Sequence, residues 1–251
     1  ASATEIFAAA IQDYGRGIIV GEPTFGKGTV QNLIDLDRWP TKEGPKFGQV
    51  KLTIAQFFRV DGDTTQHAGV VPEIQFPVTV DATEFGESTF DNALPATHIA
   101  MAPHSNLGNF APLVPTLVQR HDARVKTDKE FSWWAQDVAQ FRAERDKKLV
   151  SLNEADRRAE RDRDEAKRKQ RQADRKAMGI DIDTPDDDDG LQANERNVAK
   201  QVAAEEAAKK RPDPLLRETA AILSDAITLI SGNSKLAQQV LPAAHGSAWS
   251  Q

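Results

Sequence analysis

The chain has 251 residues, of which 39% are hydrophobic and 28% charged, and its net charge at pH 7 is −6. This length allows one or two domains. The acidic balance argues against a nucleic-acid partner, because binding to a phosphate backbone needs clustered positive charge. The chain has no cysteine, which excludes disulfides and thiolate metal sites. No apolar run approaches the roughly 20 residues that span a bilayer, so we expect no transmembrane segment.

The first thirty-one residues predict a helix followed by two strands. A stripe of apolar residues at helical spacing predicts a helix that opens at Ser2 and ends near Tyr14. The short apolar run 17–20 is typical of a buried strand, and the glycine-flanked turn 26–28 leads into a second strand over 29–36. This order places a hydroxyl at the start of a helix and a lysine between two glycines, which could bring a serine nucleophile to a lysine base.

Ser2 allows two interpretations. Ser2 and Glu5 have the spacing of a capping box, and most serines in that position only cap a helix. The start of a helix also presents unpaired N–H groups, which suit an oxyanion, and the N–H of Ala3 is the candidate donor.

Lys27 by itself would usually be a solvated turn lysine. A lysine base has to be neutral, and burial among apolar groups favours the neutral amine. Gln31 lies on the same face as Lys27 if the intervening residues are extended, and a neutral amide can hold an amine by a hydrogen bond. The apolar residues expected to line the lysine are Ile18, Val20, Phe25 and Val30.

These residues resemble the active-site blocks of a known family. The stretches 2–7 (SATEIF), 21–28 (GEPTFGKG) and 29–31 (TVQ) are similar to those of the carboxy-terminal processing peptidases, peptidase family S41. They are most similar to the tail-specific branch of that family in Gram-negative bacteria. The resemblance implies Ser2 as nucleophile, Lys27 as base twenty-five positions later, and Gln31 as the residue that orients the lysine.

The resemblance also implies what the whole protein does. It implies a periplasmic serine endopeptidase without a cofactor, whose partners are protein substrates selected by their C-terminal tails. An adaptor protein and a peripheral position at the inner membrane are further options. The family's signal peptide, PDZ module and upstream core have no counterpart here, so we expect a C-terminal fragment that is inactive alone.

The rest of the first part predicts the remainder of a peptidase core. Residues 49–54 alternate apolar and polar, which is typical of a half-buried strand. Residues 69–74 resemble the family's glycine-valine-x-proline-acid block, with Glu73 where aspartate is commoner. We therefore predict an α+β chain, in which residues 1–97 are the remnant of a mixed α/β serine peptidase core and residues 98–251 form an α-helical C-terminal domain.

Helical signals dominate the second part, after a connecting region with three prolines. Thr127 and Glu130 fit a capping box for one helix, and Ser151 and Glu154 fit another for a charged, solvent-exposed helix that ends near Ala177. The acidic linker 181–190 lacks EF-hand spacing, so we do not expect calcium there. Further helices are expected over 191–210 and from Pro212 or Pro214 to Gly232, the latter with an apolar face of Leu215, Leu216, Ala220, Leu223, Ile227 and Ile230.

The remaining candidates have structural interpretations. Asp13 lies about three helical turns from Ser2, too far for contact, so we expect it to fix the helix end. The five histidines show no metal-binding spacing, and Trp133 and Trp134 are expected to pack in the core. A non-enzymatic alternative is also open, in which residues 98–251 are a helical scaffold that docks a partner or restrains substrate access.

Overall fold

The computed structural model describes residues 2–38, 47–180, 202, 206 and 213–241. It forms two compact units, Ala1–Phe141 with Glu218–Gln251, and Arg142–Arg217. The described residues contain helices and two small sheets, joined by loops, so the predicted α+β class is confirmed.

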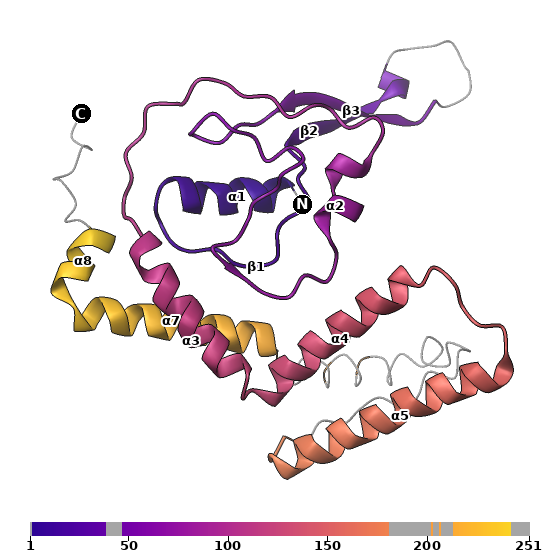
Figure 1. Cartoon of the computed structure of the whole chain (residues 1–251). Coiled ribbons are helices and arrows are strands. Elements are labelled where there is room, and N and C mark those ends of the chain that lie inside the picture. Colours follow the sequence, from indigo (N-terminus) through magenta and orange to yellow (C-terminus); the bar gives the residue numbers. More distant parts are fainter. Residues whose placement is uncertain (1, 39–46, 181–201, 203–205, 207–212, 242–251) are drawn as a thin grey trace. The chain divides into compact units, whose positions relative to one another are not determined.

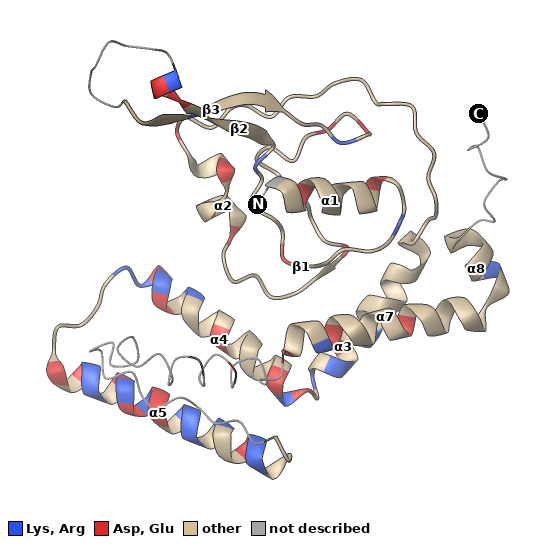
Figure 2. Cartoon of the chain, turned by 180° about the vertical axis from the view of Figure 1, so that it is seen from behind, with Lys and Arg blue, Asp and Glu red and all other residues tan. Residues whose placement is uncertain are grey.

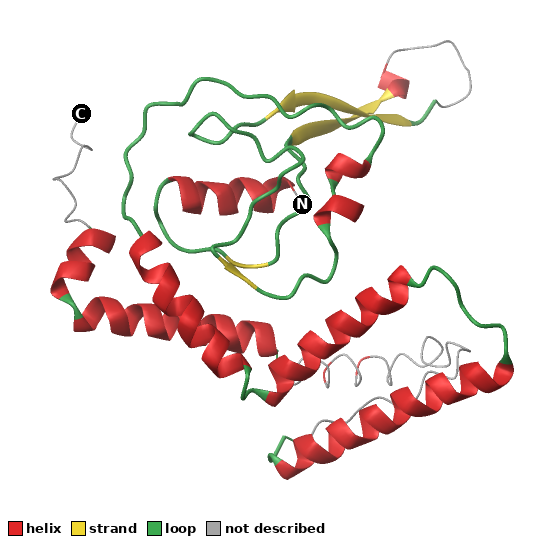
Figure 3. Ribbon diagram, viewed as in Figure 1, coloured by secondary structure: helices red, strands yellow, loops and turns green. Residues whose placement is uncertain are grey.

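Helix α1 (Ser2–Asp13) lies in the middle of the first unit, with a pair of strands on either side (Figure 1). On one side β2 (Thr29–Asp35) pairs antiparallel with β3 (Gln49–Gln56), and on the other β1 (Val20–Gly21) pairs parallel with β4 (Ile74–Gln75). Long loops connect these elements (Figure 3). The remaining short elements around them are η1 (Leu36–Arg38), α2 (Ala82–Phe85) and η2 (Glu87–Thr89).

The predictions for this half are confirmed for α1 and β2 and corrected for the other strands. The expected buried strand at 17–20 is wrong, because only Val20 of that run is in β1. One reason is that the N–H of Ile19 donates to the carboxylate of Glu73 (2.8 Å) instead of to a strand.

The strand expected at 49–54 forms as β3, but it is not half-buried. Leu52 is 50% exposed and Ile54 is 53% exposed. Among the described residues this sheet consists of β2 and β3 alone, and the face that carries Leu52 and Ile54 stays exposed.

Helices form the rest of the first unit, together with the short turn η3. They are η3 (Ala111–Leu113), α3 (Val114–Val125), the first part of α4 (Lys129–Asp146), most of α7 (Pro214–Gly232) and α8 (Ser234–Val240). Helix α3 was not predicted, because its first turn contains a proline, which the sequence analysis took as a loop signal. Both capping boxes are also wrong: Asp128 accepts from the N–H of Phe131 ahead of α4, and Asn153 caps the next helix.

The predicted apolar face of α7 is largely exposed. Leu216, Leu223 and Ile227 are more than half exposed, whereas the buried side chains of this helix are Glu218 and Ile222. Trp134 packs as expected, with its ring 5.1 Å from that of Phe131.

The second unit contains α5 (Glu154–Ala177), which has no buried residue, as predicted. Acidic and basic residues are interspersed along it (Figure 2), and pairs such as Glu154 with Arg158 (2.6 Å) support the helix. The predicted acidic linker 181–190 and the tail from 242 lie outside the described residues, as does the predicted helix 191–210 except at 202 and 206. Within the described part of the chain, no helix has the length and apolar character to cross a membrane.

Candidate functional site

A buried glutamate ties residues 24–28, the lysine loop, to the first turn of α1. Ser2 is the first residue of α1, and Glu5, one turn later, is 1% exposed. One carboxylate oxygen of Glu5 accepts from the hydroxyl of Thr24 (2.5 Å) and the N–H of Gly26 (2.6 Å), and the other accepts from the N–H of Lys27 (3.1 Å). The backbone of the candidate base is therefore held against the helix that the candidate nucleophile opens.

Glu5 was not predicted as a site residue, because its spacing from Ser2 suggested a capping box. Both of its oxygens are instead used by residues 24–27. A buried carboxylate in the first turn is also stabilised by the positive end of the helix dipole.

The amine of Lys27 has polar neighbours. Its Nζ donates to the hydroxyl of Thr29 (2.9 Å) and lies 3.9 Å from a carboxylate oxygen of Glu87, and the lysine side chain is 25% exposed. Two of the apolar residues expected to line the lysine do not bury it. Val30 is 37% exposed, and Ile18 lines a separate cavity.

Gln31 is held by the opposite strand. Its Nε2 donates to the hydroxyl of Thr53 on β3 (3.2 Å), next to a register shift between Val30 and Gln31. Lys27 and Gln31 thus each have a threonine partner of their own, one on β2 and one on β3.

The loop 61–70 supports the lysine loop from another side. Gln66, which is 1% exposed, accepts from the N–H of Gly28 (2.9 Å), and the N–H of His67 donates to the carbonyl of Gly26 (2.8 Å). A Cβ on Gly28 would lie 2.7 Å from the backbone nitrogen of Gln66, so only glycine fits this approach. No sequence signal pointed to Gln66.

Asp13 has the structural role that the sequence analysis expected. Its carboxylate accepts two hydrogen bonds from Nε of Arg59 (3.0 and 3.1 Å) and a further one from Nη2. Burial works to lower the pKa of Arg59, but the hydrogen bonds and charge of Asp13 outweigh it, and the pKa is raised. This pair fastens the end of α1 to the segment after β3.

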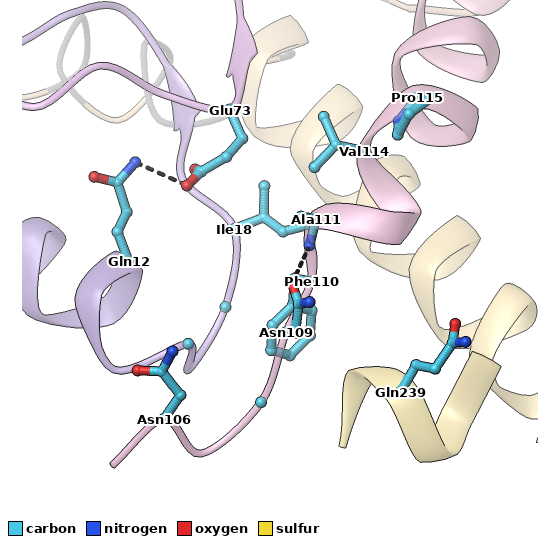
Figure 4. A pocket seen from close by; sticks show the side chains of 13 residues that line it. Gln12, Ile18, Glu73, Asn106, Asn109, Phe110, Ala111, Val114, Pro115 and Gln239 are labelled. Atoms are coloured by element: carbon cyan, nitrogen blue, oxygen red, sulfur yellow. Dashed lines mark hydrogen bonds between the residues drawn. The ribbon is translucent and has the colours of Figure 1, made fainter. Parts of the chain in front are cut away.

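A cavity of about 830 Å³ lies at the other end of α1 (Figure 4). Gln12 donates to Glu73 (2.9 Å) at its edge, and Glu73 also receives the N–H of Ile19. The residues that line the cavity include none of the candidate catalytic residues, so the cavity is not the candidate catalytic site. The lining residues are Gln12, Gly15, Gly17, Ile18, Glu73, Asn106, Gly108, Asn109, Phe110, Ala111, Val114, Pro115 and Gln239.

A partly buried charge network, with His121 and Glu218 as its buried members, joins α3 to α7. Glu218 accepts from Nδ1 of His121 (3.0 Å) and from Arg124 (2.7 Å), and Asp225 accepts from Arg120 (2.7 Å) and Arg124. Among the described residues, no group of three or more histidines and acids is arranged to hold a metal ion.

Comparison with known families decides where the chain belongs. Residues 80–228, more than half of the chain, match the family described as the C-terminal domain of tail specific protease (DUF3340), and residues 1–76 match peptidase family S41. The chain belongs to the tail-specific protease C-terminal domain family. The family resemblance drawn from the sequence is thereby confirmed. Lys27 lies in the region that matches peptidase family S41, and Glu87 lies in the region that matches the C-terminal domain family.

Individual relatives of this tail-specific protease domain are also named as proteases. The "Tail-specific protease" of Haemophilus influenzae is 44% identical over 177 residues, which are 67% of this chain and 25% of that protein. The "Carboxy-terminal-processing protease" of Bartonella bacilliformis is 39% identical over 74 residues (30% and 15%), and "Carboxy-terminal processing protease CtpA" of Bacillus subtilis is 39% identical over 75 residues (30% and 14%). The chain thus spans about a quarter or less of these relatives.

Proposed function

We propose that the chain is the C-terminal part of a serine endopeptidase that uses a Ser2–Lys27 dyad. The observation that carries the proposal is the contact of Glu5 with the Lys27 N–H, since it joins the lysine loop to the helix that begins at Ser2. The match of residues 1–76 to peptidase family S41 supports the same assignment.

The chemistry follows from these roles. The hydroxyl oxygen of Ser2 attacks the scissile carbonyl carbon while the neutral amine of Lys27 takes the hydroxyl proton. The N–H of Ala3 donates to the oxyanion, and Lys27 returns the proton to the leaving amine as the C–N bond breaks. Water, deprotonated by the same amine, then hydrolyses the acyl-enzyme and releases Ser2. Gln31 lies on β2, the strand that follows Lys27, and orients the lysine through that strand.

Lys27→Ala in the full-length enzyme tests the dyad. We expect turnover of a tailed protein substrate to fall to background while the far-UV circular dichroism stays unchanged. Lys51→Ala, which removes an exposed lysine from β3, is the matched control and should keep full activity. Proteolysis that survives Lys27→Ala would refute the assignment.

The relatives support a proposal about the substrates and the location of the whole protein. We propose protein substrates recognised by their C-terminal tails and a periplasmic location, since the Haemophilus relative is a tail-specific protease of a Gram-negative bacterium. Cleavage of one reporter protein with an apolar tail, compared with the same reporter ending in charged residues, tests the tail preference.

A docking role for the helical part is the second candidate. The connection between α4 and α5 exposes three apolar side chains, Leu149 (85%), Val150 (69%) and Leu152 (98%). Such an exposed cluster is typical of a contact with a substrate or an adaptor protein. Replacing all three by serine should slow cleavage of a folded protein substrate and leave cleavage of a short peptide unchanged. Equal loss for both substrates would contradict the docking role.

A further inference from the structure

The walls of the cavity at the end of α1 are fixed by backbone contacts. The N–H of Leu107 donates to the carbonyl of Tyr14 (2.9 Å), and the N–H of Asn109 donates to the carbonyl of Val240 (2.9 Å). A Cβ on Gly108 would lie 2.4 Å from the carbonyl oxygen of Val240, so this close approach needs glycine. These contacts hold the turn after α1, the segment before η3 and the end of α8 around one space (Figure 4).

The half-buried carboxylate of Glu73 faces this cavity without a positive partner in the lining, which contains no lysine, arginine or histidine. One of its oxygens accepts from Nε2 of Gln12 (2.9 Å) and the other from the N–H of Ile19 (2.8 Å), and both donors are neutral. Arg59, which donates to Gln12, is paired with Asp13. A carboxylate can accept about four hydrogen bonds, so Glu73 can still bind a positively charged ligand.

The rest of the lining suits an extended peptide. Ile18, Phe110 and Val114 are half-buried apolar residues, and the exposed amides of Asn106 and Gln239 can each donate to and accept from a peptide backbone. The cavity volume of about 830 Å³ lies within the range of ligand-binding pockets, roughly 300–1,000 Å³. Apolar surface, amides and one carboxylate together fit a peptide segment that carries a basic side chain.

We propose that this cavity is a second binding site for protein substrates, which takes an extended segment whose lysine or arginine pairs with Glu73. The inference rests on the proposed protease function. The cavity lies at the opposite end of α1 from Ser2, and the 12 residues of this helix rise about 17 Å. An extended chain spans about 3.4 Å per residue, so the bound segment lies about five or more residues from the scissile bond.

A matched pair of peptides tests the proposal on the full-length protein. Both peptides carry a fluorophore and blocked ends, and they differ in one residue between two valines, lysine in one and norleucine in the other. The Lys27→Ala protein should leave both peptides intact, and fluorescence anisotropy gives their affinities. We expect the lysine peptide to bind about tenfold more tightly, because norleucine keeps the apolar stem and loses the charged hydrogen bond. Equal affinities would overturn the inference.

Two opposite charge changes at Gln239 locate the site of binding. Gln239 is an exposed lining residue on α8, so neither change disturbs a buried contact. We expect Gln239→Arg to weaken binding of the lysine peptide about fivefold and Gln239→Glu to strengthen it about fivefold, with no change for the norleucine peptide. Gln238→Arg places the same charge at an exposed neighbour outside the lining and is the matched control. A lysine peptide that responds to neither Gln239 variant would bind elsewhere and contradict the proposal.

Glu73→Gln removes the carboxylate charge directly. We expect the preference for lysine over norleucine to disappear while the affinity for the norleucine peptide stays the same. A preference that survives in a folded Glu73→Gln protein would also overturn the inference. If glutamine disturbs the contact with Ile19 and the variant does not fold, the two Gln239 variants still decide the question.

Cleavage separates this inference from the proposed function. With Lys27 intact, Gln239→Arg should raise KM for a protein substrate with a basic segment about fivefold and leave kcat unchanged. Cleavage of either peptide by the Lys27→Ala protein would refute the proposed dyad. An inactive Lys27→Ala protein that binds both peptides equally would leave the dyad standing and refute the second site alone.

Discussion

Glu5 accepts a hydrogen bond from the backbone N–H of Lys27 at 3.1 Å, although the two residues are 22 positions apart in sequence. The contact involves the backbone and leaves the lysine amine free to meet other groups. Any loss of Glu5 should therefore loosen the position of Lys27 before it changes the chemistry of its amine.

Glu5→Gln should increase the mobility of the lysine loop. Glutamine offers one acceptor oxygen and places an NH₂ group against a remaining N–H donor, which costs about 2 kcal/mol for a buried site. We expect hydrogen exchange of the Gly26 and Lys27 amides to rise roughly thirtyfold and kcat to fall. Glu84→Gln is the control, and unchanged exchange in Glu5→Gln would contradict the role of Glu5.

Thr53→Val should weaken the orientation of Gln31. The hydroxyl of Thr53 accepts from Nε2 of Gln31, and loss of one neutral hydrogen bond costs about 1 kcal/mol. We expect kcat of the full-length enzyme to fall about fivefold with KM unchanged, and Thr53→Ser to restore it. A Thr53→Val enzyme with normal kcat would show that Gln31 does not need this partner.

Asp13→Ala should destabilise the fold around the end of α1. The variant leaves the guanidinium of Arg59 partly buried without its carboxylate, and breaking such a pair costs about 3–5 kcal/mol. We expect less soluble protein and a lower urea midpoint, with Asp91→Ala, at an exposed position after η2, as control. A stable Asp13→Ala enzyme that is inactive would point to a catalytic role for Asp13 instead.

The sequence was sufficient for elements whose pattern is local. The apolar stripe after Ser2 predicted α1, and the glycines around Lys27 placed the start of β2 at Thr29. The resemblance itself depends on short blocks of fixed spacing. None of this requires knowledge of residues that are distant in the chain.

The sequence was insufficient where the partner is distant. Gln66 and Glu87 lie about forty and sixty positions after Lys27, and no local pattern links them to it. On α7 the same limit led to a wrong face, because Glu218 is buried through pairing with His121 and Arg124 of α3. Hydrophobic periodicity assumes that charged residues face water, and a buried ion pair breaks that assumption.

The contact between α3 and α7 should weaken in acid. Burial alone would raise the pKa of Asp225, but hydrogen bonds from Arg120 and Arg124 outweigh it, so the pKa lies below its ordinary value. A carboxyl whose folded pKa is lowered contributes stability that is fully present above its unfolded pKa, about 3.9, and is lost as the pH falls through the folded pKa.

Asp225→Asn removes this contribution and gives the measurement. Hydrogen exchange of the α3 and α7 amides in a urea titration follows the unfolding of this region. Between pH 5 and pH 3, we expect its urea midpoint to fall further in the parent protein than in Asp225→Asn. At pH 6 the variant should be the less stable of the two, because Arg120 and Arg124 lose a charged partner there. An equal fall with pH in both proteins would contradict the role of Asp225 in the acid sensitivity of this contact.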